Sequence, residues 1–334
     1  MTNMRNKSQL KESPLFWPAE MKKNVLHVLD ETLIPKKMHY TKVKTAKEAV
    51  DVIKQMKTRA FGQFLVVLNA FLLELPSGNS KKKGDPQVLV NRLIKVAEDL
   101  NHSRPTFPFA EVTSIVVGWA KKAAAEGIDI PTYVTKNIQG YMQGIRARRL
   151  DRVQRIAQLI KNGDTVLTHC NVSGELAMAA AICKKEKKEV HFFATETRPY
   201  FQGAKLTCWE LKRMGAQVTL IADNAVASVM VDGLVNKVIV GSDRSCANGD
   251  FANKIGTYQI AVLAKEYGIP FYVLTQPSDK VKRGEDITIE FRDPNELLKF
   301  EGRKIIPGKI KGFYPGFDVV GREFITEQVA INVH

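Results

Sequence analysis

The feature that most constrains the fold is a change of pattern at Asp164. From there on, compact apolar runs rich in β-branched or aromatic residues alternate with helical stretches of roughly ten or more residues. The runs are TVLTH (165–169), VHFFAT (190–195), QVTLIA (217–222), KVIVG (237–241) and PFYVL (270–274). Strands separated by helices pair in parallel, because each helix carries the chain back across the sheet. We therefore expect a Rossmann-like α/β domain, a parallel sheet covered by helices, in the second half of the chain.

The sequence before this point is mostly helical in pattern. Residues 1–20 are expected to form a loose arm, and short strands are expected within 24–35 and 36–44. Helices are expected at 46–56, 58–75, 86–100, 110–126 and 130–163, with a turn-forming loop at 76–86. Thr45 and Glu48 have the spacing of a capping box at the first of these helices. The interpretation is a mostly helical N-terminal domain with a short β-element at 1–145, followed by the α/β domain at 146–334.

Several classes of function are disfavoured by what the sequence lacks. No strand is followed by GxGxxG or by GxxxxGK[ST], so neither a dinucleotide site nor a P-loop is expected. The net charge of +15 comes from dispersed residues and from short runs at 81–83 and 184–188. These runs lack interleaved aromatic residues, which makes a solvated basic surface a better interpretation than nucleic-acid binding. A positive surface is also compatible with attraction of a phosphorylated substrate.

The cysteines and the apolar runs indicate a compartment. The cysteines at 170, 183, 208 and 246 have neither metal-ligand spacing nor the density of a disulfide scaffold. The apolar run at 64–75 is too short to cross a bilayer, and the N-terminus has no apolar signal core. A reducing cytoplasm is therefore expected, with no membrane association.

Candidate catalytic residues lie in the stretch Thr165–Thr257, at the ends of two predicted strands. Cys170 follows the first strand and precedes a predicted helix, whose dipole would favour a thiolate. Asp243 follows the fourth strand, and ligands of open parallel sheets bind at such carboxyl ends. A thiol and a carboxylate that face one small molecule can move a proton on and off carbon. Taken singly, Cys170 fits a small buried apolar residue, and Asp243 fits a loop or capping carboxylate, better than either fits a catalytic role.

Further polar residues are candidates for holding an anion. Asn253 and Lys254 precede a predicted helix, where backbone N–H groups and an ammonium can converge on a phosphate. The complete set of candidates is Arg59, Arg104, Gln202, Asn253 and Lys254. For each of them, a solvated charge or a helix cap is the competing interpretation. Cys208, Cys246 and His169 are interpreted as structural.

Four motifs and two N-terminal segments resemble a known family. THCN (168–171), ETRPYFQGAKLTCWEL (196–211), GSDRSCANGDFANKIGT (241–257) and GEDITIEFRDPNEL (284–297) with FYPGFDV (313–319) are similar to the 5-methylthioribose-1-phosphate isomerase family. LHVLDETLIP (26–35) and KEAVDVIKQMKTR (47–59) extend the resemblance to nearly the whole chain. Relatives of that family include ribose-1,5-bisphosphate isomerases and the regulatory subunits of the initiation factor 2B exchange complex.

The resemblance implies an activity and a set of residues. The family converts an aldose 1-phosphate into a ketose 1-phosphate without cofactor or metal, and its members form homodimers. Matched by motif, Cys170 and Asp243 are the implied catalytic pair. Arg59, Arg104, Gln202, Asn253 and Lys254 match the substrate and phosphate contacts. The implied chemistry is ring opening with Asp243 as acid, followed either by proton transfer between C2 and C1 through Cys170 or by a hydride shift.

The sequence departs from the family pattern away from the catalytic pair. The family's RGAPAIG is RAFGQFL here (59–65), its RPTAVNL is RPTFPFA (104–110), and its NPAFDVTP is YPGFDVVG (314–321). The segment after Cys170 is also shorter than in methylthioribose-phosphate isomerases. An unchanged pair within an altered pocket suggests a related sugar phosphate.

These observations leave three hypotheses. The first is an isomerase of 5-methylthioribose 1-phosphate or 5-deoxyribose 1-phosphate, and the second is a ribose-1,5-bisphosphate isomerase. The third is a non-catalytic subunit that senses sugar phosphates, which would not require both Cys170 and Asp243. Within the 241–250 motif, GSDRSCANGD is closer to the methylthioribose type than to the bisphosphate type.

Overall fold

The structure is a computed structural model that describes residues 12–76, 85–276, 280–300 and 302–331. The chain divides into two compact units. One unit is Pro14–Ala147, and the other is Arg148–His334, to which Ser13 also belongs. The predicted loop 76–86 and its basic run 81–83 lie mostly outside the described residues, as does most of the predicted N-terminal arm.

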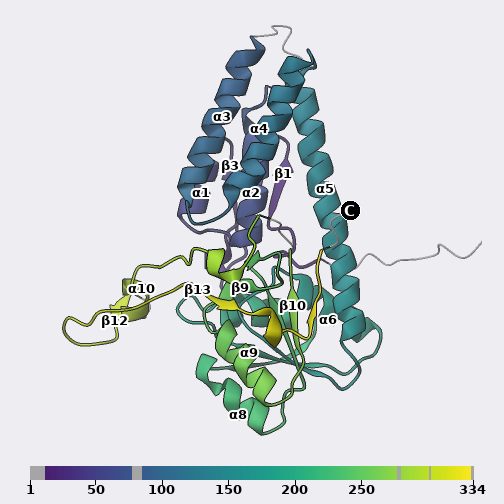
Figure 1. The fold of residues 1–334 in the computed structure, drawn as a ribbon, viewed down its shortest axis with the longest axis vertical. Helices are drawn as coiled ribbons and strands as arrows, with labels where there is room; N and C mark the ends of the chain where they lie inside the picture. Colours follow the sequence, from purple (N-terminus) through teal and green to yellow (C-terminus); the bar gives the residue numbers. More distant parts are fainter. Residues whose placement is uncertain (1–11, 77–84, 277–279, 301, 332–334) are drawn as a thin grey trace, which may run out of the picture. The chain divides into compact units, whose positions relative to one another are not determined.

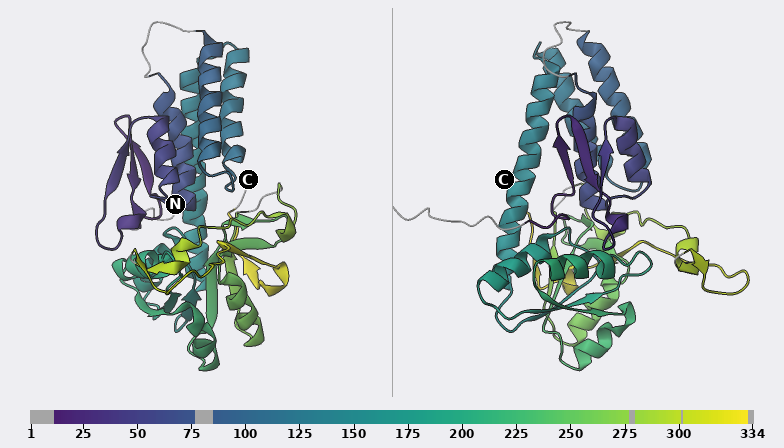
Figure 2. Two further views of the ribbon diagram at one scale, coloured as in Figure 1. Left: turned by 90° about the vertical axis from the view of Figure 1, so that its left-hand side faces the viewer. Right: turned by 180° about the vertical axis from the view of Figure 1, so that it is seen from behind.

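The unit Pro14–Ala147 contains a small antiparallel sheet. Its strands are β1 (Ala19–Lys22), β2 (Val25–Leu29) and β3 (Tyr40–Val43), in that order across the sheet. The left view of Figure 2 shows the three strands beside the helices of the same unit. The strands predicted within 24–35 and 36–44 are confirmed in shorter form, with the 3-10 turn η1 (Glu31–Leu33) between them. β1 was not predicted, because residues 1–20 were interpreted as a loose arm.

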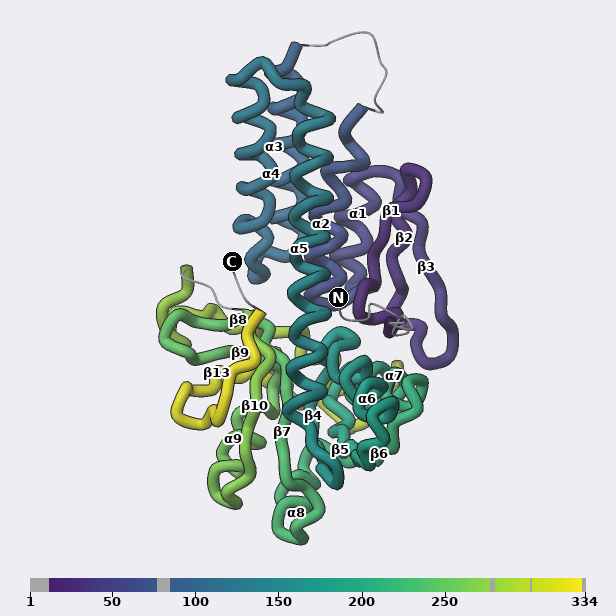
Figure 3. The backbone as a smooth tube through the Cα atoms, turned by 90° about the vertical axis from the view of Figure 1, so that its right-hand side faces the viewer, coloured from purple at the N-terminus to yellow at the C-terminus, as the bar shows by residue number. Residues whose placement is uncertain are grey.

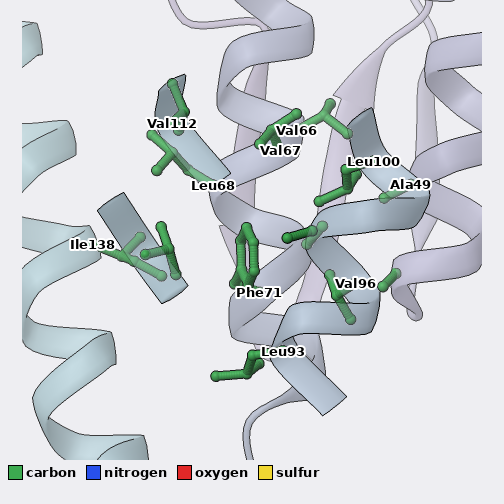
Figure 4. Close-up of a cluster of buried hydrophobic side chains, with 14 of the residues drawn as sticks. Ala49, Val66, Val67, Leu68, Phe71, Leu93, Val96, Leu100, Val112 and Ile138 are labelled. Atoms are coloured by element: carbon green, nitrogen blue, oxygen red, sulfur yellow. The ribbon is translucent and has the colours of Figure 1, made fainter. Parts of the chain in front are cut away.

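Among the described residues, five helices form most of the rest of this unit. They are α1 (Ala46–Lys54), α2 (Ala60–Glu74), α3 (Pro86–Ser103), α4 (Phe109–Ala125) and α5 (Ile130–Leu159), whose last residues belong to the other unit. The Thr45 hydroxyl accepts a hydrogen bond from the Glu48 N–H, as the predicted cap requires. α2 is apolar on most sides and lies in the core, where Phe71 is surrounded by side chains of α3, α4 and α5 (Figure 4).

The unit Arg148–His334 is built on a six-stranded parallel sheet. Its strand order is β14-β10-β7-β4-β5-β6, and Figure 3 shows β10 to β6 side by side. The strands are β4 (Thr165–Thr168), β5 (His191–Thr195), β6 (Gln217–Ile221), β7 (Lys237–Gly241), β10 (Phe271–Leu274) and β14 (Glu327–Gln328). All five predicted strands are present, and the predicted Rossmann-like α/β class is confirmed.

Helices cover both faces of this sheet. They are α6 (Glu175–Lys185), α7 (Cys208–Arg213), α8 (Val226–Val231) and α9 (Thr257–Glu266). α6 and α7 contact each other (Figure 3), and so do α8 and α9 (Figure 1). The chain moves from β4 to β6 in one direction across the sheet, and from β6 to β10 in the other. Because crossovers between parallel strands are right-handed, these two directions place the two helix pairs on opposite faces.

Smaller elements follow β7. β8 (Arg244–Ser245), β9 (Phe251–Lys254) and β13 (Phe317–Val320) form an antiparallel sheet in the order β13-β9-β8. Between β10 and β13 the chain forms α10 (Asn295–Leu298) and the hairpin of β11 (Lys299–Phe300) and β12 (Arg303–Lys304). In the described ranges, no helix is long and apolar enough to span a membrane.

Candidate active site

The strand order places the two predicted catalytic residues at one point of the sheet. β4 and β7 are neighbours, with Leu167 opposite Val238. From β4 the order continues to β5 on one side, whereas β7 starts the other half of the sheet. The carboxyl ends of the two strands at such a switch point border the crevice where ligands of open α/β sheets bind. Cys170 and Asp243 each follow the last residue of one of these strands by two positions.

Cys170 occupies an unusual backbone conformation. Its φ of 62° lies in the left-handed region, which costs a non-glycine residue about 1 kcal/mol or more. Hydrogen bonds hold the peptide groups on both sides of it. The Cys170 N–H donates to Thr197 Oγ1 at 3.0 Å, and the Cys170 carbonyl accepts from Thr207 Oγ1 at 2.5 Å. Cys170 is half-buried, whereas the competing interpretation required a fully buried residue.

The turn after Cys170 is held by hydrogen bonds of the Asn171 side chain. Asn171 Oδ1 accepts from the Ser173 N–H, and Asn171 Nδ2 donates to Glu210 at 2.7 Å. α6 begins only at Glu175, after Gly174 in the left-handed region. The prediction that a helix begins directly after Cys170 is therefore wrong, because a four-residue turn lies between them. The helix dipole acts mainly within the first turn, so its effect on the thiol is weaker than expected.

Two arginines fix the start of α6. The Glu175 carboxylate accepts from Arg149 Nε and from Arg152 Nε, each at 2.6 Å, and all three side chains are buried. Burial disfavours ionisation of Glu175, but Arg152 and Arg149 outweigh it and lower the pKa of this carboxyl. Arg149 also donates to the Ser173 carbonyl at 2.8 Å. The end of α5 thus anchors the turn that carries Cys170.

The backbone at Asp243 is held by the small antiparallel sheet. The Asp243 N–H donates to the Ala252 carbonyl at 2.9 Å, at the point where the chain leaves β7 for β8. Nearby, the two strand ends meet β9. A methyl group placed on Gly241 would lie 3.1 Å from Val172 Cγ1 and 4.0 Å from Asn253 Oδ1. The structure therefore brings together the Cys170 turn, the end of β7 next to Asp243, and Asn253.

Asn253 and Lys254 differ from their predicted positions. They are the last two residues of β9 and are buried, so they do not open helix α9, which begins at Thr257. Asn253 Nδ2 donates to Thr257 Oγ1 at 3.0 Å, and Lys254 Nζ donates to the Gly316 carbonyl at 3.1 Å. The N–H groups of Gly256 and Tyr258 both donate to Asp318 Oδ2. The prediction that N–H groups at this helix start bind an anion is therefore wrong for these two groups, because a carboxylate of the chain already accepts from them.

Gln202 carries a polar atom that the protein leaves unsatisfied. Its side chain is 5% exposed, and Oε1 has no hydrogen-bond partner among the described residues. It precedes the π-helical turn η2 (Gly203–Thr207), and short π-helical segments are frequent at functional sites. A methyl group on Gly203 would lie 1.7 Å from the Thr195 carbonyl oxygen, so glycine is required for this approach. A buried amide oxygen of this kind can accept a hydrogen bond from a ligand hydroxyl.

Arg59 and Arg104 belong to the other unit and lie at one end of α2. Arg59 is the N-cap residue of α2, and its N–H donates to buried Glu31, whose pKa is raised by burial. Arg104, at the end of α3, donates to Gln63 Oε1 at 3.0 Å. Gln63 Nε2 donates in turn to the Thr58 carbonyl at 3.0 Å. The structure thus brings the two arginines to the same helix N-terminus, a favourable place for an anion.

Several residues around Cys170 were not predicted as part of the site. Asp223, just after β6, accepts from the N–H groups of Thr197 and Arg198, each at 2.7 Å. Thr195, Thr197, Thr207 and His169 complete the contacts around the turn. The sequence signal available for them was the cluster of threonines at 195, 197 and 207 near strand ends, where hydroxyls commonly bond to the backbone.

Comparison with known proteins identifies the family. Residues 65–330 match the Initiation factor 2 subunit family. The chain belongs to this family. Its relatives in the family include the methylthioribose-1-phosphate isomerase of Desulforudis audaxviator, which is 37% identical over 93% of this chain and 91% of that protein. The 5-deoxyribose 1-phosphate isomerase of Moorella thermoacetica is 37% identical over 92% of this chain and 91% of that protein.

A solved structure of a family member matches the whole architecture. The crystal structure of 5-methylthioribose 1-phosphate isomerase from Pyrococcus horikoshii has a TM-score of 0.84 at 30% identity, covering 98% of this chain and 94% of that one. The resemblance to 5-methylthioribose-1-phosphate isomerases and their initiation factor 2B relatives, which was stated from the motifs, is confirmed. The roles of individual residues in this member of the initiation factor 2 subunit family remain predictions.

Proposed function

We propose that the protein is an aldose–ketose isomerase that converts an aldose 1-phosphate into the ketose 1-phosphate. The observation that carries the proposal is the placement of Cys170 and Asp243 at the switch point between β4 and β7. Relatives named as isomerases of this kind, similar over more than nine-tenths of the chain, support it. The proposed substrates are 5-methylthioribose 1-phosphate and 5-deoxyribose 1-phosphate.

The proposed chemistry begins with opening of the sugar ring. Phosphate on the anomeric carbon prevents spontaneous opening, so the ring oxygen must be protonated as its bond to C1 breaks. Asp243 supplies this proton, and its carboxylate then accepts the proton of the C2 hydroxyl. These two transfers return Asp243 to its starting state.

Cys170 performs the transfer between carbons. Its thiolate removes the proton from C2, which gives an enol between C1 and C2, and the thiol returns that proton to C1. As the C2 oxygen loses its proton to Asp243, the ketone forms, and both residues end as they began. A hydride shift from C2 to C1 is the competing route, and it predicts no exchange of the migrating hydrogen with solvent.

The remaining candidates are proposed to hold the substrate. Gln202 Oε1 is available to accept from a sugar hydroxyl, because no described residue donates to it. Asn253 and Lys254 are proposed as polar contacts at the same end of the sheet. Arg59 and Arg104 are proposed as phosphate ligands on the basis of the motif match and their shared position at the start of α2.

The test is an isomerase assay with matched variants. The protein is incubated separately with 5-methylthioribose 1-phosphate, 5-deoxyribose 1-phosphate and ribose 1,5-bisphosphate. Formation of the corresponding ketose is followed. Cys170→Ser and Asp243→Asn are each expected to lower kcat/KM by about 100-fold or more, the usual range for loss of an acid–base group. Cys208→Ser and the exposed Asp232→Asn serve as controls and are expected to retain activity.

Two outcomes would contradict the proposal. Turnover that survives both substitutions would remove Cys170 and Asp243 as the catalytic pair. Binding of a sugar phosphate by the unaltered protein without any turnover would favour the sensing subunit, a possibility supported by the family's name. Turnover of the bisphosphate alone would instead assign the ribose-1,5-bisphosphate isomerase activity.

We also propose that the protein is cytoplasmic, on the basis of its cysteine pattern, and that it forms a homodimer, as the resemblance implies. Analytical ultracentrifugation at micromolar concentration is expected to give twice the 37.4 kDa mass of the chain. A single species at the monomer mass would contradict the homodimer.

A further inference from the structure

His169 is a buried group for which the proposed reaction has no role. Its side chain is 2% exposed. Nε2 lies 2.9 Å from the Ile255 carbonyl oxygen, and Nδ1 lies 2.6 Å from Thr195 Oγ1. A carbonyl oxygen only accepts, so Nε2 carries a proton and donates it to Ile255. Burial lowers the pKa of His169, which favours the neutral ring, and Nδ1 of a neutral ring with Nε2–H is an acceptor.

This tautomer determines which atom donates and which accepts in the hydrogen bonds between His169 and Cys170. The Thr195 hydroxyl donates its proton to His169 Nδ1, so Thr195 Oγ1 is left as an acceptor. Thr197 Oγ1 lies 3.4 Å from Thr195 Oγ1 and 3.5 Å from the Thr195 carbonyl oxygen, so its proton can go to either acceptor of the same residue. Thr197 Oγ1 itself accepts from the Cys170 N–H at 3.0 Å. Cys170, Thr197, Thr195, His169 and Ile255 therefore form one series of hydrogen-bond donors and acceptors, which runs from the Cys170 N–H to the Ile255 carbonyl.

This series of hydrogen bonds joins two segments that carry candidate site residues. At one end it holds the peptide of Cys170, whose φ of 62° is unfavourable for a side chain with a Cβ. At the other end it reaches Ile255, the residue directly after Lys254. His169 also packs against Gly256, where a methyl group would lie 3.1 Å from its Cε1. Thr195 and Thr197 are completely buried, so water does not compete for their hydroxyls.

We propose that His169, Thr195 and Thr197 are positioning residues that hold the Cys170 turn in its left-handed conformation and tie it to the end of β9 at Asn253–Lys254. Without these bonds only Thr207, at the Cys170 carbonyl, still holds the peptide groups next to Cys170, and we expect the turn to shift toward negative φ and move the thiol. The proposal deepens the proposed function, on which its kinetic test depends. A test by alkylation of Cys170 is independent of that function.

The kinetic test removes single hydroxyl groups. Thr197→Val keeps the shape of the side chain and removes the acceptor of the Cys170 N–H. We expect kcat to fall about 10- to 100-fold with KM within threefold, because misplacement of a reacting group by about 1 Å has effects of this size. Thr197→Ser restores the hydroxyl and is expected to recover most of the loss.

A neighbouring threonine provides the matched control. Thr168, the last residue of β4, is 1% exposed, and its hydroxyl has no hydrogen-bond partner among the described residues. Thr168→Val is expected to leave kcat and KM unchanged. Equal losses in Thr168→Val and Thr197→Val would show a general packing effect and overturn the proposal, as would failure of Thr197→Ser to recover activity.

A double-mutant cycle tests whether the residues act as one chain. His169→Gln retains a donor that can reach Ile255, but it has no acceptor at the position of Nδ1, to which Thr195 donates. If His169 acts on Cys170 through Thr195 and Thr197, the double variant His169→Gln/Thr197→Val loses less kcat than the product of the two single losses. If the two losses in kcat multiply, His169 and Thr197 act independently, and the proposal that they are coupled through hydrogen bonds is overturned.

Alkylation of Cys170 by iodoacetamide separates this proposal from the proposed function. Burial raises the pKa values of Cys208 and Cys246 to about 11, so at neutral pH these thiols react slowly. Peptide mass spectrometry follows the rate at Cys170. Thr195→Val and Thr197→Val are expected to change that rate more than threefold, whereas Thr168→Val is not. An unchanged rate in both variants would overturn the proposal even if the protein proved to have no isomerase activity.

Discussion

At the residue scale, the backbone conformation of Cys170 says more about its role than its chemical type does. A small buried apolar residue at a strand end requires no positive φ, yet Cys170 has φ of 62° with a hydrogen bond on each side. Such strain persists only where surrounding contacts impose it, and it is concentrated at functional sites. Glycine accepts this conformation without cost. A cysteine in this conformation agrees with the role proposed for its side chain, although other non-glycine residues of the chain also have positive φ.

The strain predicts an inverted order of stability for two substitutions. Cys170→Gly relieves the steric cost and is expected to be more stable than Cys170→Ala by about 1 kcal/mol in urea unfolding. Cys183, inside helix α6, is the control, because there Gly is expected to be less stable than Ala by about 1 kcal/mol. The same order at both positions would show that the Cys170 turn is not strained.

At the element scale, the parts of the fold predicted from the sequence are those whose pattern is contained in one short segment. The β7 run KVIVG is bounded by polar residues, and the capping pair Thr45 and Glu48 acts within one helical turn, so both were found. β8 has two residues, and β9 reads FANK without alternation. Their pairing with each other and with β13 comes from segments distant in sequence, which periodicity cannot detect.

The same limit explains the errors at the site. Asn253 and Lys254 were assigned to a helix start because the strand they end has no pattern of its own. Asp318, which accepts from the N–H groups of Gly256 and Tyr258, is sixty or more residues away, so no local motif reveals it. The contact of Gly203 with the Thr195 carbonyl is likewise tertiary. Residue types at strand ends could be predicted, but the hydroxyl and imidazole contacts that orient them could not.

At the scale of the whole molecule, the net charge of +15 is the property most relevant to a phosphorylated substrate. A positive surface raises the encounter rate with anions, and salt screens this attraction over a Debye length of about 10 Å at 0.1 M. The charge is therefore expected to affect the capture of substrate more than the proton transfers that follow binding.

Raising the ionic strength from about 20 mM to about 300 mM is expected to lower kcat/KM several-fold while kcat stays nearly constant, because the screened field acts on encounter and not on chemistry. Two alkylating reagents provide a control at Cys170 that does not depend on turnover. The rate ratio of anionic iodoacetate to neutral iodoacetamide is expected to fall over the same range. A constant ratio together with a constant kcat/KM would mean that the positive charge has no part in attracting the substrate and is a solvated surface only.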